Sequence, residues 1–146
     1  MSSDLFNLSE KRVLITGASK GMGKAMANAL MSYGAHVVIS SRKKDQLEAC
    51  AEELKQSTSN NKVYPFAFNM SNEDDLNNLT DFAFDRLGFI DVIVGNAGVN
   101  PYYGPIGKIS TDAYQKIMNT NVYANLKLVN LISPSMKKRE NGSIIF

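Results

Sequence analysis

The chain has 146 residues, of which 44% are hydrophobic and 21% are charged, a balance typical of one soluble globular domain. A formal net charge of +2 is too small to predict a nucleic-acid or membrane-surface partner, and no apolar run approaches the length of a membrane span. One cysteine, Cys50, excludes an internal disulfide, and the first residues show no secretory signal pattern, so we expect a reducing, cytoplasmic location.

Five short apolar runs of strand type alternate with helical patterns along the chain. The strands are predicted at residues 12–16, 35–40, 63–68, 90–95 and 142–146. Pro65 is an unusual residue for the third of them. Apolar strands that alternate with helices indicate a parallel sheet with helices on both faces, because right-handed crossovers place them there. We therefore predict an α/β, Rossmann-type doubly wound sheet.

The first two helices are predicted from their apolar spacing. The first ends at Gly34 and is expected to bury one face, made of Met22, Met26, Ala29, Leu30 and Tyr33. The second is expected to pack on the sheet through Leu47, Ala51 and Leu54, and a polar loop follows it at residues 56–61.

The third and fourth helices carry recognisable end residues. Ser71 and Asp74 resemble a capping box that opens the third helix, which ends near Gly88. The fourth is predicted from about residue 110 to residue 133, because Pro134 would stop it. Its apolar stripe consists of Tyr114, Ile117, Met118, Leu128 and Leu131. Asn121 lies within that stripe, and a buried amide needs hydrogen-bond partners.

The stretch LITGASKGMGKAMANAL, residues 14–30, joins the first strand to the first helix and carries three glycines. Ligands of such folds bind at the carboxyl ends of the strands, where this stretch lies. A Walker A loop is excluded, because Ala18 and Ala25 occupy the positions of its first glycine and its magnesium-binding hydroxyl. The pattern G-x-G-x-x-G also fails in register, whereas T-G-x-x-x-G-x-G fits residues 16–23.

This loop resembles the cofactor loop of the classical short-chain dehydrogenases/reductases. Gly17 would allow the turn off the strand, Gly21 would let the backbone approach a pyrophosphate, and Gly23 would let the helix pack closely. The resemblance implies cofactor contacts at Thr16, Gly17, Ser19, Lys20, Gly21, Met22 and Gly23. A glycine-rich turn without a ligand is the alternative interpretation.

The resemblance extends over the whole chain. The sequence GNAG, residues 95–98, is similar to the family's N-N-A-G and implies cofactor contacts at Asn96, Ala97 and Gly98. Gly95 replaces the usual first Asn of that motif. Asn69 and Met70 occupy the place of an Asp-hydrophobic pair that contacts adenine, and Asn69 can still accept from the adenine amino group. The sequences SSRK and NAGVNPYYGPI are most similar to the carbonyl-reductase branch.

The end of the second strand favours NADP(H) over NAD(H) as the cofactor. NAD-dependent folds place a carboxylate there to bind the ribose diol, whereas residues 40–44 read SSRKK. Arg42, beside Ser41, would grip a 2′-phosphate through two parallel hydrogen bonds, and Lys20 would reach the same phosphate. At a helix start each cation costs roughly 0.3–1 kcal/mol, which an anionic ligand would offset. A solvated basic run is the alternative.

The family's reaction is a hydride transfer between the nicotinamide and a carbonyl or alcohol substrate. Its members use a Ser after the fifth strand, a Tyr and a Lys in a Y-x-x-x-K motif, and an Asn in the long helix that holds a water of the proton relay. Asn121 matches that Asn, and the alternative is an amide that bonds backbone groups at a helix kink. Tyr123 and Lys127 have Y-x-x-x-K spacing, but Tyr123 lies roughly 200° around the helix from Asn121, so we expect both to face outward.

The sequence stops at Phe146, inside the fifth predicted strand. We therefore expect one dinucleotide-binding domain over residues 1–146, incomplete at its carboxyl end and lacking the terminal strands and the catalytic Ser, Tyr and Lys. Two functions stay open: the cofactor half of an NADP(H)-dependent carbonyl reductase or alcohol dehydrogenase, inactive by itself, or a noncatalytic dinucleotide-binding or interaction module. The expected partners are a small carbonyl or alcohol substrate and a second copy of the chain, because relatives pair through the long helix. No metal-ligand spacing is present.

Overall fold

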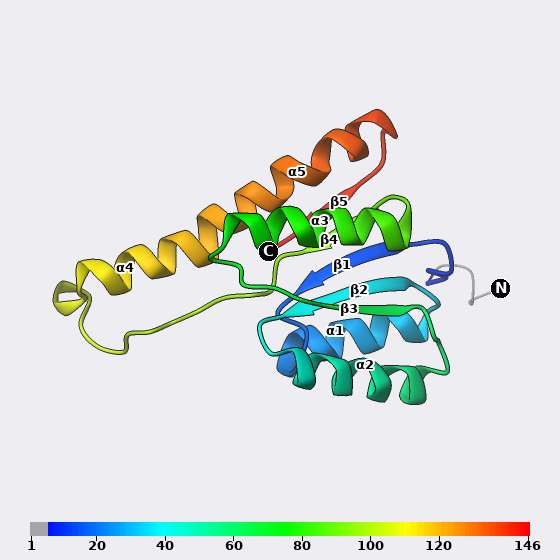
Figure 1. Ribbon diagram of the computed structural model, residues 1–146, viewed down its shortest axis with the longest axis horizontal. Coiled ribbons are helices and arrows are strands. Elements are labelled where there is room, and N and C mark those ends of the chain that lie inside the picture. The colour runs from blue at the N-terminus through cyan, green and yellow to red at the C-terminus, as the bar shows by residue number, and fades with distance from the viewer. Residues whose placement is uncertain (1–5) are drawn as a thin grey trace.

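The computed structural model describes residues 6–146, which form a five-stranded parallel sheet with helices on both faces (Figure 1). The strands are β1 (Arg12–Thr16), β2 (His36–Ser41), β3 (Val63–Ala67), β4 (Val92–Val94) and β5 (Ser143–Ile145). Their spatial order is β3-β2-β1-β4-β5, so the direction of winding reverses between β1 and β4. The predicted doubly wound α/β fold is confirmed, and its ligand site belongs at that reversal.

The helices form one layer on each side of the sheet. Figure 1 shows α1 (Gly21–Ser32) and α2 (Lys44–Thr58) on one side, and α3 (Glu73–Leu87) on the other. A long rod shares the side of α3 and runs beyond the sheet at its α4 end (Figure 1). The rod consists of α4 (Thr111–Met118), a π-helical turn (Asn119–Tyr123) and α5 (Ala124–Lys138), and a 3-10 turn (Ile106–Lys108) precedes it.

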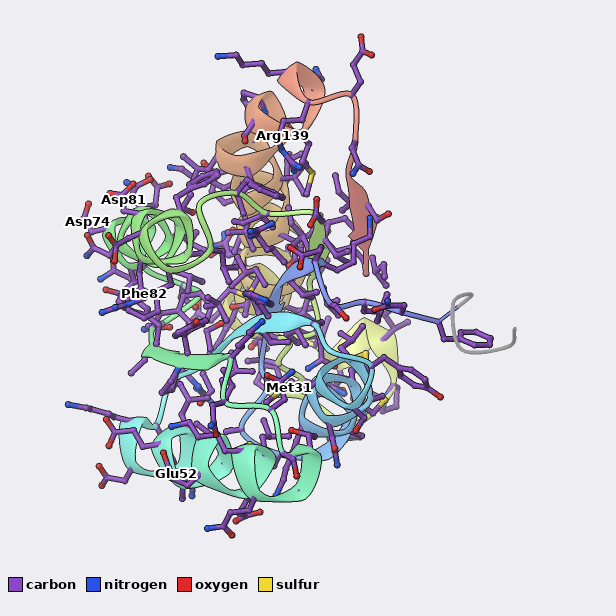
Figure 2. All side chains as sticks on the ribbon, turned by 90° about the vertical axis from the view of Figure 1, so that its right-hand side faces the viewer. Met31, Glu52, Asp74, Asp81, Phe82 and Arg139 are labelled. Atoms are coloured by element: carbon purple, nitrogen blue, oxygen red, sulfur yellow. The ribbon has the colours of Figure 1, made fainter. Side chains whose placement is uncertain are left out.

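Each helical layer has its own apolar core against the sheet. Ile15 and Ile39 face α1 and α2 and pack in one core with Met31 of α1. Leu14 and Val38 face the opposite side, where they pack in a second core with residues of α3 and α5. Figure 2 shows Met31 of α1 and Phe82 of α3 on opposite sides of the sheet. Because neighbouring residues of one strand are buried on opposite faces, the central strands read as continuous apolar runs. None of the helices within residues 6–146 is long and apolar enough to cross a membrane.

The buried face of α1 differs from the predicted one. Its buried residues are Gly23, Ala27 and Met31, whereas Met22 is 77% exposed. A Cβ built on Gly23 would lie 2.4 Å from the carbonyl oxygen of Gly17, so α1 meets the loop before it at very close range. The contact face of α1 therefore combines Gly23 and Ala27 with Met31, and the predicted residues Met26 and Leu30 pack against the same core while partly buried.

Two predicted helix boundaries are wrong. Helix α5 continues through Pro134 to Lys138, and α2 continues through the predicted loop to Thr58. Proline removes one helical hydrogen bond, but Ile132 and Met136 on either side of it are buried, and their packing holds the helix together. Pro65 lies in β3, which is an edge strand, where proline is tolerated.

The amino-terminal cap of α3 is Asn72, where the sequence predicts Ser71. The side-chain oxygen of Asn72 accepts hydrogen bonds from the amides of Asp74 (2.9 Å) and Asp75 (3.3 Å). The hydroxyl of Ser71 lies instead 3.1 Å from the hydroxyl of Thr120 in the π-helical turn. A tertiary contact therefore removes Ser71 from the capping role.

The carboxyl end of the rod is tied to the start of β4. Arg139 donates hydrogen bonds to Oδ1 of Asp91 (3.0 Å) and to the carbonyl oxygen of Ile90 (2.6 Å). Its guanidinium also lies over the ring of Phe89. Figure 2 shows Arg139 at this end of α5, above the sheet. These contacts fix the rod at the amino-terminal ends of the strands.

Candidate functional site

A cleft of about 530 Å³ lies at the carboxyl ends of the parallel strands, at the predicted ligand position. All predicted cofactor-binding residues except Thr16 and Gly23 line it: Gly17, Ser19, Lys20, Gly21, Met22, Ser41, Arg42, Asn69, Met70, Asn96, Ala97 and Gly98. The fold therefore brings together four loops that are far apart in the sequence.

Hydrogen bonds join the loop after β1 to the loop after β4. The hydroxyl of Thr16 accepts from the amide of Ala97 (3.0 Å) and faces the carbonyl oxygen of Val94. The side-chain nitrogen of Asn96 donates to the carbonyl oxygens of Thr16 (3.1 Å) and Gly17 (3.0 Å). Thr16 is fully buried, so it positions the cleft wall without lining it.

Two glycines of the loop adopt the left-handed conformation. Gly17 has φ +68°, and a Cβ on it would lie 2.8 Å from the Cα of Ala97. Gly21 has φ +57° and open space where its Cβ would be. The loop therefore packs tightly against the β4 loop at Gly17 and leaves room beside its backbone at Gly21, where a ligand can approach.

The amino terminus of α1 is suited to an anion. The helix begins at Gly21, its preceding residue Lys20 makes no side-chain cap, and its first turn contains no acidic residue. The first amides of a helix have no partner within the helix, and the helix dipole is positive at this end. Because Gly21 and Met22 line the cleft, these amides are available to a phosphate there.

The charged side chains that line the cleft are all cationic. They are Lys20, Arg42, Lys43 and Lys116, and within residues 6–146 no Asp or Glu lines the same cleft. Lys116 comes from α4, whereas the other three come from the loops after β1 and β2. Several positive charges in one concave site attract a ligand with several negative charges.

Sequence reasoning missed part of the lining. It assigned no cofactor role to Lys43, Gln46, Phe68, Ser71, Val99, Lys116 or Thr120, which all line the cleft. Lys43 and Phe68 adjoin predicted residues, so a search of the neighbours would have found them. Lys116 and Thr120 belong to the rod, whose orientation over the sheet is not encoded in any local pattern.

Asn121 lies behind the cleft and holds the loop after β4. Its side-chain oxygen accepts from the amide of Val99 (2.8 Å), and its side-chain nitrogen donates to the carbonyl oxygen of Val99 (2.9 Å). Its own carbonyl oxygen accepts from the side chain of Asn125 (2.8 Å). This geometry matches the alternative interpretation, an amide that bonds backbone at a helix kink, and a role in proton transfer stays a prediction.

Tyr123 and Lys127 face away from the cleft, as predicted. The hydroxyl of Tyr123 donates to Oε1 of Glu73 (3.3 Å), and Lys127 forms an ion pair with the same carboxylate. The hydrogen bond from Lys127 lowers the pKa of Glu73, and the same bond raises the pKa of Lys127. These two residues therefore link α5 to α3.

Cys50 lies beneath the glycine-rich loop. Its thiol donates to the carbonyl oxygen of Ala18 (3.4 Å), and burial raises the pKa of the thiol. A protonated, buried thiol is a poor nucleophile. We therefore assign Cys50 to the support of the loop.

The sequence model of the short chain dehydrogenase family matches residues 11–146. Dehydrogenase/reductase SDR family member 4 of Caenorhabditis elegans is 34% identical over 146 residues, which cover 100% of this chain and 56% of that protein. The chain spans about half the length of the curated relatives it matches.

Two solved structures have the same fold. A metagenomic short-chain oxidoreductase in complex with NADP has a TM-score of 0.86 and 29% identity, over 94% of this chain and 62% of that one. L-Sorbose reductase from Gluconobacter frateurii, complexed with NADPH and L-sorbose, has a TM-score of 0.86 and 26% identity, over 95% of this chain and 52% of that one. Since the family model covers nearly the whole chain and the fold agrees, the chain belongs to the short-chain dehydrogenase family.

Proposed function

We propose that the chain is the cofactor-binding half of an NADP(H)-dependent oxidoreductase that transfers hydride between the nicotinamide and a carbonyl or alcohol substrate. The observation that carries this proposal is the cleft, which joins the amino terminus of α1 to four cationic side chains. The similar metagenomic oxidoreductase and L-sorbose reductase, which hold NADP and NADPH, support the choice of cofactor.

The residues of the cleft suit the parts of this cofactor. The amides at the start of α1 would bind the pyrophosphate, since the backbone at Gly21 is open to the cleft. Arg42 and Lys20 would hold the 2′-phosphate beside Ser41. The bound nicotinamide would supply or accept the hydride, and the chain's own residues bind and orient it.

In this proposal Asn121 contributes to catalysis by position. Its two hydrogen bonds fix the backbone of Val99, which lines the cleft next to Gly98. A fixed loop holds the bound cofactor in one orientation, which lowers the entropic cost of reaching the reactive geometry.

A noncatalytic dinucleotide-binding module is the second candidate function. One observation favours it: within residues 6–146 no tyrosine lines the cleft, so no phenol stands there as a general acid. In both candidates the cleft binds the dinucleotide, and we propose that these 146 residues bind it without turnover.

Arg42→Asp tests the cofactor assignment. A carboxylate at this position would repel a 2′-phosphate and accept from a ribose diol, so the preference should change from NADPH to NADH. Loss of a charge-assisted hydrogen-bond pair predicts a fall of roughly ten- to hundredfold in NADPH affinity, measured by isothermal titration calorimetry.

Lys44→Asp is the matched control for this experiment. Lys44 lies two residues from Arg42, pairs with Glu48 on α2 and does not line the cleft. Lys44→Asp changes the net charge of the chain by the same amount as Arg42→Asp. Because Lys44 lies outside the cleft, NADPH affinity should stay close to that of the unaltered chain. Equal NADPH affinity in Arg42→Asp and Lys44→Asp would contradict the assignment.

A further inference from the structure

Asn69 lies where the base of a bound dinucleotide belongs. The ribose 2′ group lies at the end of the second strand in such folds, here beside Ser41, and the base is attached to the same ribose. Strand β3 pairs with β2 up to Ala67 opposite Ser41, and the amide of the next residue, Phe68, donates to the carbonyl oxygen of Ser41 (2.9 Å). The base therefore meets the residues directly after β3.

The cleft wall at this point combines two apolar residues with the polar residues Asn69 and Ser71. Phe68 and Met70 line the cleft and are each only 4% exposed, so they are fixed parts of its wall. Asn69 lies between them in sequence, is exposed and lines the cleft as well. An apolar wall suits a purine ring, and Asn69 is placed to read the polar edge of that ring.

The orientation of the Asn69 amide follows from its partner. Its Oδ1 lies 3.1 Å from the backbone nitrogen of Ser71. A backbone N–H can only donate, so the bonded atom must be the oxygen, and Nδ2 is the end left for a ligand. The backbone amide of Asn69 donates to Oδ2 of Asp75 (2.8 Å), which fixes the turn. The oxygen that the sequence assigns to the adenine amino group therefore already accepts one hydrogen bond, and its second lone pair is open.

An amide donor and a carboxylate would read purines differently. Adenine presents a ring acceptor, N7, beside an amino donor, whereas a 6-oxopurine presents N7 beside an oxygen acceptor. A carboxylate accepts only, so it favours the amino group and repels the oxygen. The Nδ2 group of Asn69 donates to N7 of either base and also to the 6-oxygen.

We propose that Asn69 makes this cleft tolerant of the base, so that a hypoxanthine dinucleotide binds nearly as well as the adenine one. The inference rests on the proposed function, since it requires a nicotinamide dinucleotide in the cleft. Asn69 is thus a specificity-determining residue through its donor group.

The test compares NADPH with reduced nicotinamide hypoxanthine dinucleotide phosphate by isothermal titration calorimetry on the 146-residue chain. We expect their dissociation constants to agree within about threefold for the unaltered chain, because the neutral amide of Asn69 repels neither base. In Asn69→Asp the ratio should rise at least tenfold in favour of NADPH. The Asp carboxylate can still accept from the Ser71 amide, so the turn is retained.

Asn69→Ala is the matched control, because it removes the side-chain donor without adding an acceptor. Both dissociation constants should rise, because the donor is lost, and they should stay similar to each other. A preference of the unaltered chain for NADPH of tenfold or more, or an unchanged ratio in Asn69→Asp, would overturn the inference while leaving the proposed function intact. Binding of neither dinucleotide by the folded, unaltered chain would overturn both.

Discussion

At the scale of single residues, the glycines of the β1 loop differ in what constrains them. Gly17 and Gly21 both have positive φ, which disfavours any residue with a Cβ. Only Gly17 also lacks space, because its Cβ would enter the backbone of Ala97. Gly17 therefore serves the packing between two loops, whereas Gly21 serves the approach of a ligand.

A pair of alanine substitutions separates these two constraints. Gly21→Ala should lower the free energy of unfolding by about 1–2 kcal/mol, the usual cost of a left-handed alanine. Gly17→Ala should lose a further ~1–3 kcal/mol, because the β4 loop must move to admit the methyl group. Urea unfolding followed by circular dichroism measures both values. Equal losses in the two variants would show that the contact with Ala97 is unimportant.

Among the individual site residues, local motifs pointed to the strand-to-helix loop and to GNAG, and most of these residues line the cleft. Their residue types are dictated by backbone geometry, as at Gly17, or by a hydrogen bond between loops, as at Asn96. Lys116 was not predicted, because a lysine on a helix has the same appearance whether it faces solvent or a cleft. The donor orientation of Asn69 was also beyond prediction, since it depends on the turn to Ser71.

At the scale of elements, the start of α3 shows how a tertiary contact selects between two caps. Ser71 and Asn72 are both good capping residues and stand next to each other. Ser71 bonds to Thr120 of the rod, which leaves Asn72 to receive the amides of the first turn. The capping-box spacing of Ser71 and Asp74 was correct as a pattern but not as a structure.

Asn72→Ala should therefore destabilise the chain more than Ser71→Ala. Loss of the cap leaves two amides of α3 without a side-chain partner and should cost about 1 kcal/mol in the free energy of unfolding. Ser71→Ala keeps the cap and loses only the contact between the hydroxyls of Ser71 and Thr120, so its cost in the free energy of unfolding should be smaller. Thermal unfolding of both variants, followed by circular dichroism, gives the comparison. A larger loss for Ser71→Ala would restore Ser71 as the cap.

The rod is the element whose course the sequence predicted least well. One long helix ending before Pro134 was expected, whereas the structure has a π-helical turn at Asn119–Tyr123 and continues to Lys138. Such turns often occur at functional sites, and this one directs Thr120 to the cleft and Asn121 to Val99. The predicted stripe members Tyr114 and Met118 are exposed, because α4 has no buried residue and projects beyond the sheet (Figure 1).

At the scale of the whole molecule, the rod presents an apolar stripe to solvent. Tyr114, Met118, Val122 and Leu126 follow each other at four-residue spacing, and Val122 and Leu126 are 52% and 55% exposed. Figure 1 shows that the α4 end of this rod projects beyond the sheet, where a second molecule has access. We propose that a second copy of the chain packs against this stripe, which would form the interface of the predicted homo-oligomer.

Lysine substitutions on the stripe should separate the copies. The double variant Val122→Lys, Leu126→Lys introduces charges that a buried interface does not tolerate, so it should sediment as a monomer. The unaltered chain should sediment as a dimer or larger species in analytical ultracentrifugation. Ile106→Lys is the control, because Ile106 is 89% exposed on the 3-10 turn and lies outside the stripe. A monomeric unaltered chain, or equal sedimentation of all three, would contradict the proposal.

The sequence by itself determined the alternation of strands and helices, the doubly wound class and the glycine-rich loop that lines the cleft. These features depend on local physics: apolar runs for strands buried on both faces, and glycine where no Cβ fits. The family match and the fold both agree with these predictions.

Only the tertiary structure decided which side chains face the cleft from the rod, which residue caps α3 and which face of α1 is buried. Each of these depends on contacts between segments far apart in sequence: Ser71 with Thr120, and Gly23 with the side chain of Asn96. A local pattern can state what a residue is able to bond with. The three-dimensional packing determines which of the available partners it meets.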